Sequence, residues 1–209
     1  MSLSRSRLEA ALRSQQDPYL GRDLQQFVTR MDIHGDQVHV ELALPYPFAG
    51  IVEQLQQQVV DALTEAGAQT IHYDFVLQVS RSKPTNAVEA VPPIKNVIVV
   101  ASGKGGVGKS TTAVNLALAL AKEGARVGIL DADIYGPSIA HLLDLKDKPE
   151  LKNNLLQPIL KYGLKIISIA NLVDANQAGI WRGPMVTKIL YQLIRAVNWQ
   201  ADKKKVEVM

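Results

Sequence analysis

The chain has 209 residues, of which 47% are hydrophobic and 21% charged, a balance typical of a globular protein with a genuine core. No apolar run approaches the roughly 18 residues that a membrane-spanning helix needs, and the N-terminus lacks a secretory signal, so we expect a cytoplasmic protein without a membrane partner. The absence of cysteine excludes disulfides, a thiol nucleophile and thiolate ligation of metal from within these residues. The net charge of +3 is too small to indicate nucleic acid as a partner.

The first 82 residues predict a small α+β domain. Apolar and polar residues alternate over 38–44 and again over 71–79, which is the pattern of half-buried strands. Between them, apolar residues recur every three or four positions and Gly67 follows, so the sequence predicts an amphipathic helix ending there. A further helix is expected over 5–14, and together these elements form one helical layer on a short sheet.

A proline-containing linker is expected over 83–94, followed by a second domain over 95–209. The unbroken apolar run 96–102 predicts a strand buried on both faces of a parallel sheet. A helix follows, with a stripe formed by Ala113, Leu116, Ala117 and Leu120, and then a buried strand over 126–130. Further along, 164–170 predicts a strand and 184–197 a helix. The whole indicates an α/β domain with a doubly wound parallel sheet.

A glycine-rich loop lies between the first strand of this domain and its first helix. Residues 103–110 read GKGGVGKS and match the phosphate-loop pattern G-x4-G-K-[ST]. In that context, backbone N–H groups and the helix N-terminus converge on phosphate oxygens, and glycines permit close approach. Lys109 is expected to reach the β- and γ-phosphates and Ser110 to ligate magnesium. The nucleotide-binding residues expected from the motif and its flank are Gly103, Lys104, Gly105, Gly106, Val107, Gly108, Lys109, Ser110 and Thr111.

Three further residues are candidates for phosphate chemistry. Lys104 lies inside the loop, where a flexible cation can act on a transferring phosphoryl group in its own or a neighbouring subunit. Asp131 and Asp133 stand at the carboxyl end of the next strand, where open parallel sheets place their ligand crevice. One carboxylate is expected to join the magnesium shell and the other to position the attacking water. The alternative is that these aspartates only cap the following turn.

These motifs resemble the Mrp/ApbC group of deviant-Walker ATPases, relatives of MinD and ParA, which bind and transfer iron-sulfur clusters. The resemblance rests on residues 97–121, 127–139 and 181–186, where the strings GPS after DADIY and WRGPM are typical of Mrp. Residues 17–24, DPYLGRDL, resemble the small domain that precedes the ATPase in many bacterial members.

The resemblance implies a P-loop NTPase that binds ATP and Mg²⁺, acts as a homodimer and serves iron-sulfur apoproteins. It implies that Lys104 is the signature lysine acting across the dimer and that Asp131 lies near the magnesium. It places Asp133 in the first switch loop, so Lys104 and Asp133 are the expected catalytic residues.

Two features of the family are absent from these 209 residues: the second switch and the Cys-x-x-Cys pair that ligates the cluster. The tail 200–209 is atypical for the family. In a doubly wound sheet, the strand that leads to the second switch would lie beside the strand that precedes the glycine loop. Without it, backbone groups and apolar surface of the central strands are uncovered, so we expect reduced stability. An alternative function is a MinD- or ParA-like partitioning ATPase, and another is a nucleotide-binding remnant without cluster activity.

Other residues carry weaker expectations. The four histidines lack ligand spacing and are expected at the surface, with no metal role. Trp181 and Arg182 are candidates for nucleotide or dimer contact, although a packing role for the tryptophan is the simpler interpretation. The lysines at 203–205 are expected to form a solvated tail.

Overall fold

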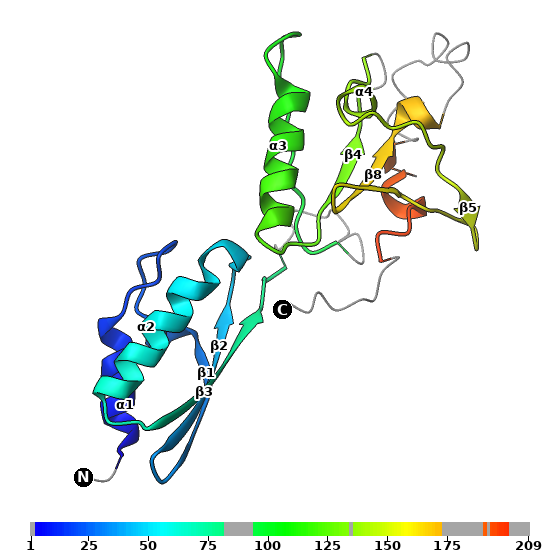
Figure 1. Cartoon of the computed structure of the whole chain (residues 1–209). Coiled ribbons are helices and arrows are strands. Elements are labelled where there is room, and N and C mark those ends of the chain that lie inside the picture. The colour runs from blue at the N-terminus through cyan, green and yellow to red at the C-terminus, as the bar shows by residue number, and fades with distance from the viewer. Residues whose placement is uncertain (1–2, 82–93, 134–135, 173–189, 192, 201–209) are drawn as a thin grey trace. The chain divides into compact units, whose positions relative to one another are not determined.

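In the computed structural model, the chain divides into two compact units, Met1–Ser80 and Arg81–Met209 (Figure 1). The structure describes residues 3–81, 94–133, 136–172, 190–191 and 193–200. Within these ranges, none of the helices is both long and apolar enough to span a bilayer. The linker, Trp181, Arg182 and the lysine tail lie outside the described residues, as does most of the helix expected over 184–197.

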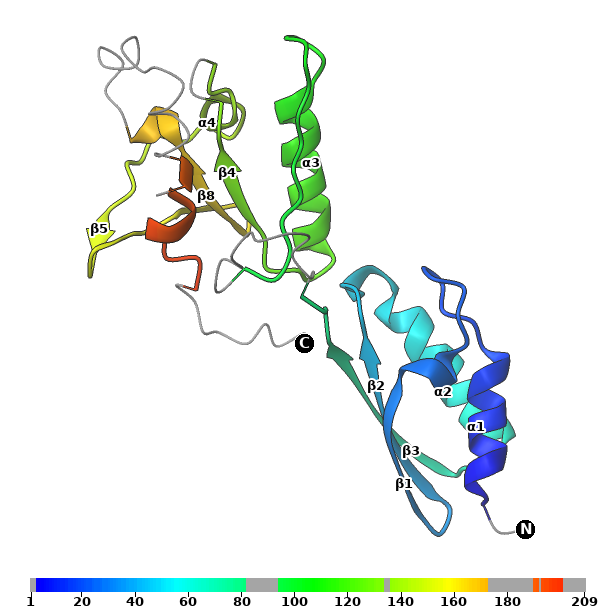
Figure 2. The same ribbon diagram turned by 180° about the vertical axis from the view of Figure 1, so that it is seen from behind.

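The N-terminal unit packs two helices on one face of a three-stranded sheet (Figures 1 and 2). Its sheet has the order β1-β2-β3, with β1 antiparallel and β3 parallel to β2. Because parallel strands need a crossover, α2 connects β2 to β3 across the sheet. The elements are α1 (Arg5–Ser14), β1 (Val28–His34), β2 (Gln37–Leu44), α2 (Val52–Glu65) and β3 (Thr70–Leu77), with short 3-10 turns at Leu24–Phe27 and Ala49–Ile51.

The alternating and helical patterns of this unit produce one apolar core. Leu8 and Leu12 of α1 and Leu55 of α2 are fully buried, as are the inward residues Val40 and Leu42 of β2. The predicted helices and both predicted strands are therefore confirmed. The strand β1 escaped the sequence analysis, although a two-residue Gly-Asp turn between it and β2 is a hairpin signal.

The second unit contains a mixed sheet with the order β4-β8-β7 and a separate two-stranded hairpin. Its elements are α3 (Lys109–Lys122), β4 (Gly128–Asp131), α4 (Ile139–Leu142), β5 (Leu151–Lys152), β6 (Leu155–Leu156), β7 (Ile159–Lys161) and β8 (Leu164–Ser168), followed by a 3-10 turn at Ile169–Asn171. Strands β4 and β8 are parallel, whereas β7 returns antiparallel beside β8. Residues 190–191 and 193–196 are helical.

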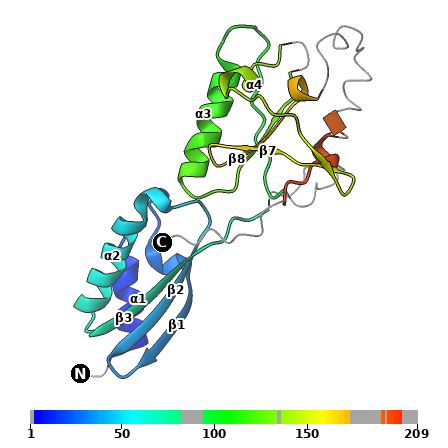
Figure 3. The same ribbon diagram turned by 45° about the vertical axis from the view of Figure 1, so that its right-hand side comes forward.

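Both faces of this sheet are covered, which places it in the expected α/β class. On one face, Ile129 and Ile166 pack against Val114 and Ala117 of α3. On the other face, Leu130 and Ile167 belong to a second cluster with Leu190, Leu193, Val197 and Trp199 (Figure 3). Successive residues of a strand point to opposite faces, so adjacent apolar residues in β4 and β8 supply both layers.

One prediction for this unit needs correction. Residues 96–102 join none of the sheets in the described part of the chain, and Val97, Ile98 and Val99 are 70%, 64% and 80% exposed. An apolar run favours a strand, but a strand also needs a neighbour for its N–H and C=O groups, and local composition does not specify that neighbour. The expected α/β class holds with its parallel pair β4–β8, and the tight turn at Tyr162 and Gly163 adds β7 antiparallel to β8.

The buried stripe of α3 is shifted from the predicted one. Val114 and Ala117 are buried, whereas Leu116 is 38% exposed. In a helix that is apolar on most sides, the sequence pattern leaves the rotation about the axis undefined, and contact with β4, β8 and α4 selects it.

Trp199 closes this unit against β4. A Cβ built on Gly128 would lie 2.6 and 2.8 Å from two ring carbons of Trp199, so only glycine fits there without movement. We expect Gly128→Ala to lower the free energy of unfolding by about 1–3 kcal/mol, the usual range for overpacking. Thermal unfolding would measure it, and Trp199→Ala in the same chain should remove most of the additional cost. Equal stability of Gly128→Ala and wild type would contradict this packing.

Candidate functional site

The glycine-rich loop adopts a conformation that requires glycine at two positions. Gly106 and Gly108 have φ angles of 75° and 85°, in the left-handed region that side chains rarely adopt. Gly108 caps the N-terminus of α3, so Lys109 and Ser110 begin the helix directly after the loop. A Cβ at Gly103, Gly105, Gly106 or Gly108 would meet nothing within 4 Å, so open space surrounds the loop. The arrangement leaves backbone N–H groups and a helix N-terminus accessible to an anion.

Lys109 and Asp133 form the central ion pair of the site. Lys109 Nζ lies 2.7 Å from Asp133 Oδ2, with the two side chains about one-third exposed. The hydrogen bond to Asp133 raises the pKa of the Lys109 ammonium, and the charges of Asp133 and Asp131 act in the same direction while burial opposes them. The loop lysine and the strand-end aspartate, 24 positions apart in the sequence, are thus brought into direct contact.

Asp131 is buried at the end of β4, only 3% exposed. Its Oδ1 accepts a hydrogen bond from the Asp133 N–H at 3.2 Å, and its Oδ2 accepts bonds from the Ser168 hydroxyl at 3.1 Å and the Ile139 N–H at 3.3 Å. Burial raises the pKa of the Asp131 carboxyl, although these three hydrogen bonds act in the opposite direction. The three hydrogen bonds therefore fix the orientation of this buried carboxyl group.

Two serines at this site were missed by the sequence analysis. The Ser138 hydroxyl donates to Ser110 Oγ at 2.5 Å, and Ser168 contacts Asp131 as described above. Ser168 is the register partner of Asp131 across the parallel strands β4 and β8. Ser168 lies near the carboxyl end of the strand predicted over 164–170, and this position could have indicated that it belongs to the site. The contact of Ser138 depends on how the segment 131–139 folds back, which the sequence does not show.

The side chains present fit a nucleoside triphosphate with magnesium. The hydroxyl of Ser110 and the carboxylate of Asp131 are the hard oxygen donors that Mg²⁺ accepts, and Lys109 supplies a cation beside the open glycine loop. Lys104 lies in the exposed part of the loop, where its backbone oxygen accepts a bond from Ser102. The nucleotide-binding residues expected over 103–111 thus comprise the glycine loop and the first turn of α3.

Comparison with known families assigns the class of protein. A family model described as NUBPL iron-transfer P-loop NTPase matches residues 93–203, so the second unit is that of a P-loop NTPase. The chain belongs to the NUBPL iron-transfer P-loop NTPase family. A second model, described as iron-sulfur cluster assembly protein, matches residues 5–70.

Several curated relatives are named iron-sulfur cluster carrier protein. The chain is 44% identical to that of Haemophilus influenzae over 191 residues, covering 89% of this chain and 52% of the relative. It is 40% identical to that of Deinococcus radiodurans, covering 90% of this chain and 54% of the relative. The chain thus spans about half the length of the curated relatives it matches.

Among solved structures, the chain is similar to a nucleotide-binding protein from Archaeoglobus fulgidus in complex with ADP. That match has 41% sequence identity and a TM-score of 0.41, and it covers 48% of this chain and 38% of the other.

Proposed function

We propose that this chain is the nucleotide-binding part of an iron-sulfur cluster carrier that binds and hydrolyses ATP with Mg²⁺ as a homodimer and delivers clusters to apoproteins. The single observation that supports it most directly is the Lys109–Asp133 pair at 2.7 Å beside the open glycine loop. The names of the relatives favour a cluster carrier over a partitioning ATPase. ATP and Mg²⁺ supply the transferable phosphoryl group and the positive charge that neutralises it.

Each residue of the site has a proposed role. The N–H groups of residues 103–111 and the ammonium of Lys109 bind the phosphates, while Ser110 and Asp131 hold the magnesium. Asp133 accepts a hydrogen bond from the attacking water and orients it. Lys104, exposed in the loop, neutralises charge that develops on the phosphoryl group of the partner subunit.

Mixing two inactive variants tests this division of roles. Lys104→Ala and Lys109→Ala are each expected to lose turnover, because the first lacks the cation given across the dimer and the second lacks phosphate binding. In a mixed dimer, the Lys104→Ala subunit keeps its own Lys109 and receives Lys104 from its partner. Phosphate release should therefore reappear on mixing. If each variant is inactive alone and the mixture remains inactive, Lys104 does not act across a dimer.

The cluster part of the proposal has a separate test. Because these 209 residues contain no cysteine, they supply no thiolate to a cluster. Anaerobic reconstitution with iron and sulfide should leave this chain without the visible absorption of a cluster, whereas the longer Haemophilus influenzae relative should acquire it. Absence of that absorption from both proteins would argue against the cluster-carrier part of the proposal.

The ion pair at the site predicts tighter nucleotide binding for Asp133→Asn. Asp133 competes with a phosphate for the Lys109 ammonium in the free protein, where the side chains of this pair are about one-third exposed. We therefore expect the variant to bind a non-hydrolysable ATP analogue up to about fivefold more tightly, with turnover reduced. Calorimetry on the wild type and on Asp133→Asn measures this difference. Asp144→Asn, which replaces an exposed aspartate in the same unit, is the control. Weaker binding by Asp133→Asn would show that Asp133 itself assists the nucleotide.

A further inference from the structure

Two histidines meet on the face of the N-terminal sheet that the helices leave open. His39 of β2 and His72 of β3 are register partners on parallel strands, and their ring centroids lie 6.5 Å apart in an edge-to-face arrangement. Asp74, two residues after His72 and therefore on the same face, bonds to His39, with Nε2 and Oδ2 2.7 Å apart. The cluster of His39, His72 and Asp74 is separate from the nucleotide site in the other unit.

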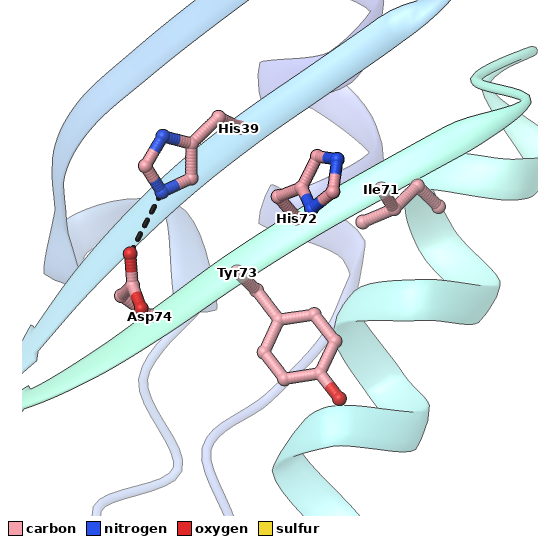
Figure 4. A pocket seen from close by; sticks show the side chains of 5 residues that line it. All are labelled: His39, Ile71, His72, Tyr73 and Asp74. Carbon is pink, nitrogen blue, oxygen red and sulfur yellow. Dashed lines mark hydrogen bonds and ion pairs between the residues drawn. The ribbon is translucent and has the colours of Figure 1, made fainter.

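The surroundings of this cluster leave it accessible. Figure 4 shows Ile71 and Tyr73 directed away from the three polar side chains, and both pack against the apolar core. His39 and Asp74 are 38% and 62% exposed, and His72 is exposed. These residues line a pocket of about 550 Å³. The sheet therefore fixes the backbones of the cluster, the His39–Asp74 bond holds two of its side chains together, and the exposed His72 side chain has room to turn.

We propose that His39, His72 and Asp74 bind a first-row divalent cation of the class of Fe²⁺, Co²⁺ and Zn²⁺. Two imidazoles and one carboxylate form a donor set that such cations accept, whereas Mg²⁺ prefers oxygen ligands alone. This proposal does not depend on the proposed function.

The geometry of the His39–Asp74 pair suits adjacent ligands of one ion. Two ligand atoms about 2.1 Å from an ion and at right angles are about 3 Å apart, close to the 2.7 Å between Nε2 and Oδ2. The cation takes the place of the hydrogen between these atoms, and His39 then coordinates through Nε2 as a neutral imidazole with its proton on Nδ1.

His72 completes the set by a rotation of its side chain. Among the described residues, no three histidine, aspartate or glutamate side chains are already arranged around one metal position. The exposed ring of His72 turns toward the His39–Asp74 pair, and water fills the remaining positions of the cation. Because this turn costs side-chain freedom, the site should bind more weakly than a fully preformed one.

The test is titration of the untagged full chain with Co²⁺ in the absence of nucleotide, followed by visible absorption, with Zn²⁺ calorimetry beside it. We expect one saturable equivalent for the wild type and at least tenfold weaker binding for His39→Gln and for His72→Gln. Asp74→Asn should weaken binding by about 10–100-fold, the usual effect of losing a carboxylate that supports or joins a metal site. Excess Mg²⁺ should leave Co²⁺ binding unchanged.

Two other histidines supply matched controls. His34→Gln replaces an exposed histidine opposite Gln37 on the same sheet, and His141→Gln replaces an exposed histidine in the other unit. Both variants should bind as the wild type does, and thermal unfolding should confirm that every variant is folded. The proposal is overturned if the wild type shows no saturable Co²⁺ binding, or if His72→Gln binds within twofold of His34→Gln.

Discussion

Replacing Lys109 with alanine is expected to weaken the binding of ATP with magnesium by about 10–100-fold. Lys109 begins α3 directly after the glycine loop, and its ammonium contacts Asp133 beside that loop. A hydrogen bond to a charged group contributes about 1.5–3 kcal/mol, so the loss corresponds to about 10–100-fold in the dissociation constant. Calorimetry on the purified chain measures this effect.

Lys104→Ala is the matched control for this variant, because it removes a lysine from the same loop. It should retain binding, since Lys104 is proposed to act on the phosphoryl group of the partner subunit rather than to bind its own nucleotide. Undiminished binding by Lys109→Ala would remove the phosphate-loop assignment. Binding weakened by Lys109→Ala and kept by Lys104→Ala would support the roles given to the two lysines.

Asp131→Asn is expected to remove the dependence of nucleotide binding on magnesium. Removal of a hydrogen-bonding partner of a metal ligand lowers metal affinity by about 10–100-fold. Because Asp131 is proposed as a direct ligand, we expect its replacement to lower magnesium affinity by at least this factor. Titration of nucleotide with and without Mg²⁺ measures it. Ser168→Ala, which removes one donor to the same carboxylate, should have a smaller effect. Unchanged magnesium dependence in Asp131→Asn would exclude Asp131 from the metal shell.

The same variant tests the pH dependence that the raised pKa of Asp131 implies. A carboxyl whose pKa is higher in the folded than in the unfolded state contributes stability that is fully present below the unfolded value of 3.8. That stability is lost as the pH rises through the folded pKa, because the folded state then holds a buried charge. The melting temperature of Asp131→Asn relative to wild type should therefore increase over the pH range above 3.8, through the folded pKa. A constant difference across this range would contradict the raised pKa.

Local patterns predicted much of the N-terminal unit correctly. The helix expected over 5–14 and the amphipathic helix ending near Gly67 both form, because each sequence has one apolar stripe that only one core can bury. The strand β1 was missed because its alternation is weak and its pairing with β2 follows from the hairpin turn. In such a strand, the cross-strand partner decides more than the residue types do.

Most residues of the candidate nucleotide site were predictable from the sequence motif. The motif over 103–110 predicts a phosphate loop, and the structure shows left-handed φ angles at Gly106 and Gly108 and a helix that begins at Lys109. What the motif does not contain is its partners. Asp133 was expected nearby, but its direct bond to Lys109 and the Ser138–Ser110 contact follow from how the segment 131–139 folds back.

Residues 96–102 do not form the strand that their amino-acid composition predicts. Their apolar run suggests a buried strand, yet in the structure three of these residues are more than half exposed and the run joins no described sheet. Burial and strand pairing both require neighbours that are distant in the sequence, so a correct local pattern still leaves the outcome undecided.

The order of apolar, polar and glycine residues along this chain determined α1, α2 and α3, the strands β2, β3, β4 and β8, the phosphate loop and the chemical class of its ligand, because each depends on neighbours within a few positions. Tertiary structure alone decided the Lys109–Asp133 pair, the burial of Asp131 and the meeting of His39 with His72. The histidines lie 33 positions apart and have no ligand spacing, and only the parallel register of β2 and β3 places them side by side. Such contacts arise from strand pairing and chain reversal. The free energy of both depends on many residues that are distant in the sequence, so no short segment predicts them.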